Sequence, residues 1–280
     1  MTDPATVQQN IQTIRALSND LAGFLHTLPD DVWRDPDIFA SACAGWKVAD
    51  VVTHLITIAG MKTLSIQSAL RGSTSPPMGY RHKSAEERLQ EIVNLREAFY
   101  EDIFYEFNAS CLRLNSLLVG LEPDQYELAA WHPARVMDVS RLIELRLMEL
   151  AIHAWDIRYG FDRNAKINPV AVPFLKGWLP NWLRASFRKP ADLEGSVTFR
   201  FDLNDSDSEA HDLKVRSDSF SLESADLASD ADVTVSLDSS AYILFLMGRV
   251  NLRRSVRRRQ IGLEGDMETA ARFGEWFVGV

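Results

Sequence analysis

The chain has 280 residues, which is enough for about two domains of ordinary size. Hydrophobic residues make up 46% and charged residues 25%, a mixture that excludes wholesale disorder, collagen-like repeats and a disulfide scaffold. The formal net charge of −9 argues against a protein that coats nucleic acid or an anionic membrane, because such binding needs an excess of lysine and arginine.

Cysteine usage and the N-terminal segment bear on the compartment. Cys43 and Cys111 are the 2 cysteines of the chain, too few for a four-cysteine zinc site, and a chain so poor in cysteine fits a reducing interior. The N-terminal residues are acidic and polar where a secretory signal would be basic and then apolar, and no apolar stretch is long enough to span a membrane. We therefore expect a cytoplasmic protein with no nucleic-acid or membrane partner, whose oligomeric state the sequence leaves open.

The first half of the chain is predicted to be helical. Apolar residues recur every three or four positions, and Ser84 with Glu87 forms the pattern of a capping box at the start of one helix. Gly and Pro between 71 and 83 predict a loop, and the Asp-rich stretch 30–37 predicts a turn. The expected helices cover 7–28, 48–70, 84–118 (kinked or split) and 138–159. They predict a four-helix bundle over residues 1–165.

The second half changes from helical periodicity to alternation. After one more helical segment at 168–187, polar and apolar residues alternate in three runs, which is typical of strands with one face toward solvent. The expected strands are 196–203, 212–216, 232–237 and a short one at 261–263, with helices at 240–247 and 266–277. We expect a small α+β domain over residues 166–280, so that the whole chain is a two-domain α+β protein.

A candidate metal site comes from two of the predicted helices. Glu149 and His153 are four residues apart and so lie on one helical face, while His54 projects toward the apolar side of the 48–70 helix. Two imidazoles and a carboxylate would leave coordination positions open, as catalytic zinc sites do, and iron or nickel would accept the same ligands. On spacing alone, a hydrogen bond on the helix surface and a core histidine stay open as alternatives.

Two segments resemble a known family. Residues 41–55, SACAGWKVADVVTHL, and residues 146–156, RLMELAIHAWD, resemble the mycothiol-dependent maleylpyruvate isomerase family, whose N-terminal bundle is DinB-like. The resemblance implies that His54, Glu149 and His153 bind a divalent metal, usually zinc. Residues 231–237, 246–249 and 262–266 are similar to the family's sterol-carrier-like second domain. Ala44 and Ala49 depart from the family pattern, which commonly has Pro and Arg there; these are not metal positions.

The resemblance implies the chemistry of a low-molecular-weight thiol. A metal with three protein ligands can bind mycothiol or a related thiol and stabilise its thiolate, the nucleophile, which would then attack an electrophilic small molecule. We expect S-transfer in preference to cis–trans isomerisation. Arg249 is expected to hold a carboxylate of thiol or substrate.

Two residues near the predicted ligands have open roles. Asp156 could accept a hydrogen bond from a metal-binding imidazole and so orient it, or be an exposed carboxylate near the end of its helix. Arg146, one turn before Glu149, could pair with that carboxylate or help to bind the thiol.

A rival hypothesis rests on a basic segment. Six arginines lie between residues 249 and 259, which is typical of a solvated helix face. The rival is a non-catalytic, metal-containing binding or regulatory protein that presents this segment to a partner. A lipid-carrying module is a third possibility, based on fold analogy alone.

Overall fold

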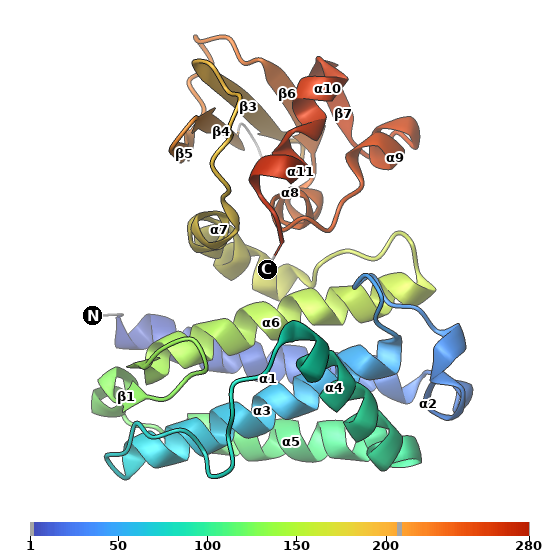
Figure 1. The fold of residues 1–280 in the computed structure, drawn as a ribbon, viewed down its shortest axis with the longest axis vertical. Helices are drawn as coiled ribbons and strands as arrows, with labels where there is room; N and C mark the ends of the chain where they lie inside the picture. The colour runs from blue at the N-terminus through green and yellow to red at the C-terminus, as the bar shows by residue number, and fades with distance from the viewer. Residues whose placement is uncertain (1–2, 206–208, 280) are drawn as a thin grey trace. The chain divides into compact units, whose positions relative to one another are not determined.

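The computed structural model describes residues 3–205 and 209–279, and the chain divides into two compact units, Met1–Ala171 and Val172–Val280 (Figure 1). The first unit is helical and the second contains a β-sheet, so the predicted α+β class is confirmed. The predicted boundary near residue 165 lies just before the division between the units.

The first unit is a four-helix bundle with shorter elements around it. Each of α1 and α3 packs against both α5 and α6, which closes the bundle, and α4 lies outside against α3. The helices are α1 (Pro4–His26), α2 (Asp31–Arg34), α3 (Val48–Leu70), α4 (Ala85–Phe99), α5 (Ile103–Val119) and α6 (Val139–Phe161). A small antiparallel pair, β1 (Ala129–Ala130) and β2 (Met137–Asp138), precedes α6.

Local sequence signals explain where the helices begin and end. The Ser84 hydroxyl accepts from the Glu87 amide at 3.1 Å, and the Glu87 carboxylate accepts from the Ser84 amide at 2.7 Å, so the predicted capping box opens α4. The expected split in this helical stretch occurs at Tyr100, whose φ of 46° lies in the left-handed region and ends α4. The stretch 30–37 differs from the predicted turn, because α2 forms within it.

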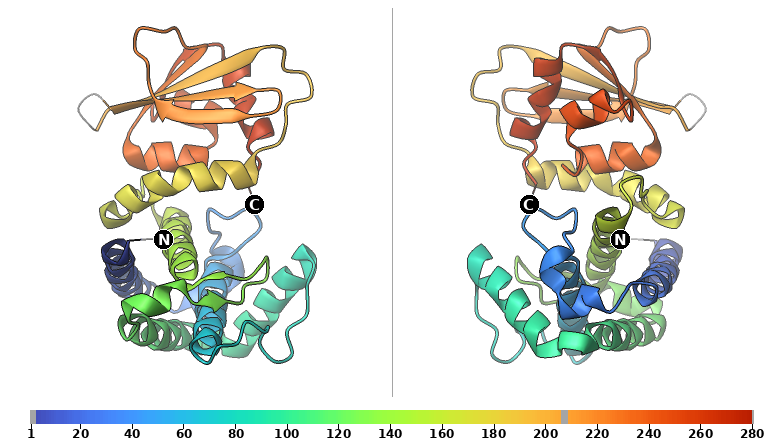
Figure 2. Two further views of the ribbon diagram at one scale, coloured as in Figure 1. Left: turned by 90° about the vertical axis from the view of Figure 1, so that its left-hand side faces the viewer. Right: turned by 90° about the vertical axis from the view of Figure 1, so that its right-hand side faces the viewer.

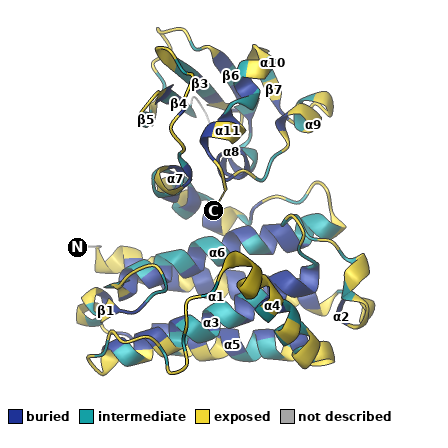
Figure 3. Ribbon diagram, viewed as in Figure 1, coloured by how far each residue is buried: buried dark blue, intermediate teal, exposed yellow. Residues whose placement is uncertain are grey.

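The core of the bundle follows the predicted apolar stripes. Ile14, Leu17, Leu55, Phe107 and Leu150 are fully buried, and Figure 3 shows buried residues along the inward faces of α1, α3, α5 and α6. Burial of these apolar faces stabilises the packing of the helices against one another. Among the described helices, none combines the length and hydropathy that crossing a membrane would need.

The second unit is a five-stranded sheet with helices packed on it (Figure 2). The strand order is β5-β4-β3-β6-β7, with β3 parallel to β6 and the other neighbours antiparallel. The strands are β3 (Ser196–Leu203), β4 (Glu209–Arg216), β5 (Phe220–Ser224), β6 (Val233–Leu237) and β7 (Gly262–Gly265). The helices are α7 (Val172–Ser186), α8 (Ser239–Leu246), α9 (Leu252–Arg257), α10 (Met267–Ala271) and α11 (Phe273–Trp276).

The alternation of the strands sets the inner face of this sheet. Phe199 and Phe201 are fully buried, and their rings meet those of Phe273 and Tyr242 from the covering helices. This unit differs from the sequence-based prediction at three places: β5 was not predicted, β4 begins at Glu209 and not at residue 212, and the closing helix is divided into α10 and α11 at Arg272.

Candidate metal centre

The predicted metal-binding residues come together between α3 and α6. His54 stands on α3, and its ring lies 5.1 Å, centroid to centroid, from the ring of His153 on α6, at an interplanar angle of 83°. Glu149 lies one turn before His153 on the same face of α6 and acts electrostatically on both imidazoles. Packing of two helices therefore brings together residues that are almost a hundred positions apart in the chain.

Glu149 has a partner that the sequence analysis missed. The ammonium of Lys62, on α3, lies 3.3 Å from Oε2 of Glu149, and the exposed fractions of the two side chains are 2% and 19%. An ionised carboxylate inside the bundle is costly without a partner, and Lys62 is such a partner for Glu149. The sequence signal for this partner is Lys62 itself, a charged residue within the apolar pattern of α3.

Arg146 does not form the ion pair considered for it. It is 1% exposed, and its Nη1 donates to the carbonyl of Leu55 at 3.1 Å while its Nη2 donates to Sγ of Cys111 at 3.5 Å. These contacts join α6 to α3 and α5 inside the bundle. A role of Arg146 in binding the thiol stays a prediction.

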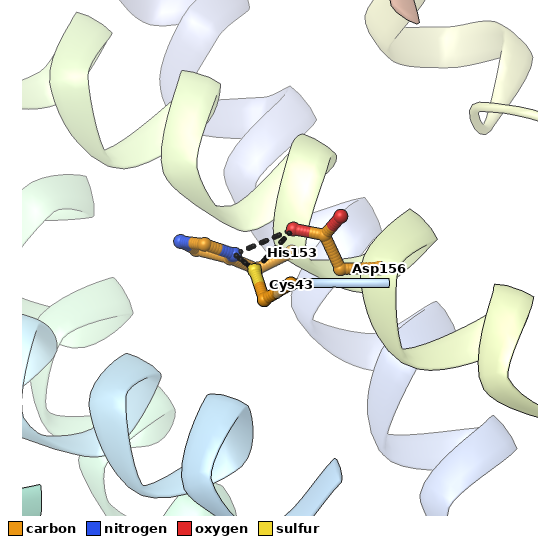
Figure 4. A group of neighbouring side chains, drawn as sticks. All are labelled: Cys43, His153 and Asp156. Carbon is orange, nitrogen blue, oxygen red and sulfur yellow. Dashed lines mark hydrogen bonds and ion pairs between the residues drawn. The ribbon is translucent and has the colours of Figure 1, made fainter. Parts of the chain in front are cut away.

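Asp156 is a buried residue of the site and not an exposed carboxylate near a helix end. It is 0% exposed, and its Oδ2 lies 2.9 Å from Nδ1 of His153 (Figure 4). An ionised carboxylate only accepts hydrogen bonds, so with Asp156 ionised this contact requires a proton on Nδ1 of the neutral His153 ring. The lone pair of His153 is then on Nε2, the nitrogen available to a metal, as in carboxylate–histidine–metal arrangements.

Cys43 completes this cluster from the loop before α3. Its Sγ donates to Oδ2 of Asp156 at 3.0 Å and lies 3.8 Å from Nδ1 of His153 (Figure 4). The ligand atoms of these three residues lie within 4.8 Å of one another, a grouping that could itself hold a metal ion. A metal ion held by these three residues would take Nδ1 of His153 away from Asp156. A metal ion bound at Nε2 of His153 would leave the contacts of Asp156 with His153 and with Cys43 in place.

The electrostatics of the site favour metal-binding protonation states. Burial, together with His153, lowers the pKa of His54 from its ordinary 6.5 to about 4, so His54 is a neutral imidazole near neutral pH. Burial alone would raise the pKa of Glu149, but Lys62 and the two histidines hold it below its ordinary value. Burial also lowers the pKa of Lys62, although the negative charge of Glu149 opposes this shift. The pKa of His132 is lowered mainly by burial and further by the positive charge of Lys62.

The donor set therefore fits a divalent ion. A neutral His54, a His153 whose proton is placed on Nδ1, and an ionised Glu149 are the forms in which these side chains ligate zinc. The structure brings the three side chains together, and their role as metal ligands stays a prediction.

Arg249 belongs to the second unit. It follows α8, is half-buried, and its amide donates to the carbonyl of Leu244 at 2.8 Å across Gly248, whose φ of +73° closes the helix. Within the basic segment, Arg253 forms an exposed ion pair with Glu268 at 2.7 Å. Both side chains of this pair are largely exposed, so the pair contributes little to stability.

The fold and the site define a class of protein: a helix bundle with a histidine–glutamate–histidine cluster, followed by a small α+β domain. The profile of the mycothiol maleylpyruvate isomerase N-terminal domain matches residues 14–158, and that of the SCP-2 sterol transfer family matches residues 186–278. The chain belongs to the family of the first profile, which spans slightly more than half of it, and the resemblance noted from sequence is confirmed.

Solved structures agree with this fold. The crystal structure of a mycothiol-dependent maleylpyruvate isomerase superimposes with a TM-score of 0.61 at 17% sequence identity, covering 89% of this chain and 93% of that one. A mutant of that enzyme, with a histidine replaced by alanine, gives a TM-score of 0.62 with the same identity and coverage. At this identity the likeness establishes the shared fold. No curated protein matched the chain.

Proposed function

We propose that the protein is a metal-dependent enzyme that uses mycothiol, or a related low-molecular-weight thiol, to act on an electrophilic small molecule, with zinc as its divalent metal. One observation carries the proposal: His54 of α3 meets His153 and Glu149 of α6 in a chain of this family. The proposal includes the cytoplasmic location and the absence of nucleic-acid and membrane partners expected from the sequence.

The residues of the chain have distinct parts in this proposal. His54, Glu149 and His153 would hold the ion, which when bound would stabilise the thiolate form of the thiol. Asp156 keeps the proton of His153 on Nδ1 and so keeps Nε2 available. Arg249 is proposed to bind a carboxylate group of the thiol or the substrate, and Arg146 to help bind the thiol.

Two reactions are compatible with a bound thiolate. In cis–trans isomerisation its sulfur adds to an activated cis double bond, the resulting single bond rotates, and loss of the sulfur restores the double bond in trans. In S-transfer the sulfur displaces a leaving group, which departs with its electron pair, and the thioether is the product. The family's name favours testing isomerisation first, although S-transfer is the reaction expected from the sequence.

The first experiment measures metal content per chain by elemental analysis. Wild type, His153→Ala and a control, His26→Ala, are purified together; His26 is an exposed histidine of α1 outside the site. The proposal expects about one divalent ion per chain in wild type and in the control, with most of it lost from His153→Ala. No ion in wild type after incubation with zinc would refute the metal site.

The second experiment measures turnover. Zinc-loaded protein is assayed with mycothiol and maleylpyruvate, and then with a panel of alkylating electrophiles, with glutathione and no thiol as comparisons. Activity independent of any thiol would refute the proposal. Binding of thiol and metal without turnover would favour the non-catalytic rival, which then requires that charge reversal at Arg253, Arg254 and Arg257 abolish its function.

A further inference from the structure

A buried lysine accompanies the proposed metal ligands. Lys62 lies on α3 a little more than two turns after His54, and its side chain is 2% exposed. Among the described residues, Glu149 is the one carboxylate within ion-pair distance of its ammonium, at 3.3 Å. A lysine so deeply buried is costly to the fold unless its charge has a partner, so Lys62 depends on Glu149 as Glu149 depends on it.

We propose that Lys62 is a positioning residue that sets the affinity of the site for its metal ion, by acting as the counter-charge of Glu149. This inference rests on the proposed function, because it takes His54, Glu149 and His153 as the ligands. Lys62 neutralises the one carboxylate among those three ligands, and it adds a positive charge next to the place where a cation would bind. Both effects weaken cation binding.

Removal of the lysine charge has two opposing consequences. Without Lys62, the metal-free protein carries an uncompensated buried carboxylate, and binding of a divalent ion relieves that cost. Loss of the contact also frees the Glu149 side chain, and losing a group that orients a ligand typically weakens metal binding. Breaking a buried ion pair is typically the larger effect, and the repulsion between ammonium and ion adds to it. We therefore expect tighter binding when Lys62 is neutralised.

The experiment measures the zinc dissociation constant by competition with a chromophoric chelator near neutral pH. Lys62→Met removes the charge and the hydrogen-bond donor, whereas Lys62→Gln removes the charge and keeps a donor. The control is Lys83→Met, since Lys83 forms a partly exposed pair with Glu91 elsewhere in the same unit. The expected result is binding at least about tenfold tighter in both Lys62 variants and unchanged within about twofold in the control.

A second measurement, the rise in melting temperature on adding zinc, keeps the test independent of activity. We expect a larger rise in the Lys62 variants than in wild type. Folding of Lys62→Met only in the presence of zinc would support the inference, and if that variant does not fold at all, Lys62→Gln decides. Equal or weaker zinc binding in a folded Lys62 variant, with wild type binding normally, would overturn this inference alone. No zinc binding by wild type would overturn the proposed metal site and this inference with it.

Discussion

Substitution of Asp156 by Asn is the sharpest test of how the site is assembled. The side chain is fully buried, and its Oδ2 accepts from both Nδ1 of His153, at 2.9 Å, and Sγ of Cys43, at 3.0 Å. Asn has nearly the same shape but no charge, and its amide nitrogen donates hydrogen bonds. The substitution therefore keeps the packing and weakens the contact that fixes the tautomer and orientation of His153.

The magnitude follows from the chemistry of that contact. Removing a group that orients a metal-ligating histidine typically weakens metal binding by about 10- to 100-fold, which corresponds to about 1.4 to 2.7 kcal/mol. Hydrogen bonds to a charged group contribute about 1.5 to 3 kcal/mol each. Asn keeps one acceptor oxygen and so weakens the two contacts without removing both, and the metal-free protein should lose about the equivalent of one such bond. Both effects should be present in Asp156→Asn.

The assay is zinc affinity by chelator competition, with urea denaturation of the metal-free protein in parallel. Asp162→Asn is the matched control, because Asp162 is an exposed aspartate that caps the end of the same helix. We expect no change in zinc affinity in the control. If Asp156→Asn were folded and bound zinc as tightly as wild type, Asp156 would have no part in orienting His153, and the assignment of its ring proton would lose its support.

Three further predictions concern the fold and its dependence on pH. His54 has a pKa of about 4 in the folded protein, whereas in the unfolded chain it takes up a proton near pH 6.5. Its contribution to the free energy of unfolding is therefore fully present above pH 6.5 and is lost as the pH falls toward 4. The free energy of unfolding of the metal-free protein, measured by urea denaturation, should fall by about 3 kcal/mol over this pH range. An equally steep fall in His54→Asn would contradict the assignment of this loss to His54. A Cβ at Gly160 would lie 2.7 Å from the carbonyl oxygen of Ala40, so Gly160→Ala should destabilise by about 1 to 3 kcal/mol. Gly23→Ala, with open space around the added carbon, should stabilise by about 0.5 to 1 kcal/mol, and equal thermal shifts in the two variants would refute the packing argument. Ser84→Ala should cost about 1 kcal/mol through loss of the α4 cap, and an unchanged melting temperature would show that the cap contributes nothing.

Some parts of the fold were predictable because the information is local. The helix predicted over 48–70 matches α3, and the strand predicted over 196–203 matches β3, since the periodicity of one face is written in contiguous residues. The strand β5 was missed because none of its residues is fully buried, which leaves the alternation without a clear apolar face.

The candidate site also combines features set by the local sequence with features set by tertiary packing. The spacing of Glu149 and His153 on one helical face follows from the sequence by itself, because residues four apart on a helix are neighbours whatever surrounds them. The partners of these residues depend on which other segments pack against α6. Tertiary structure alone brought His54 to His153, paired Glu149 with Lys62, and buried Asp156 against Cys43. These contacts join residues distant in the chain, and only the packing of helices and loops into one core decides which distant side chains meet.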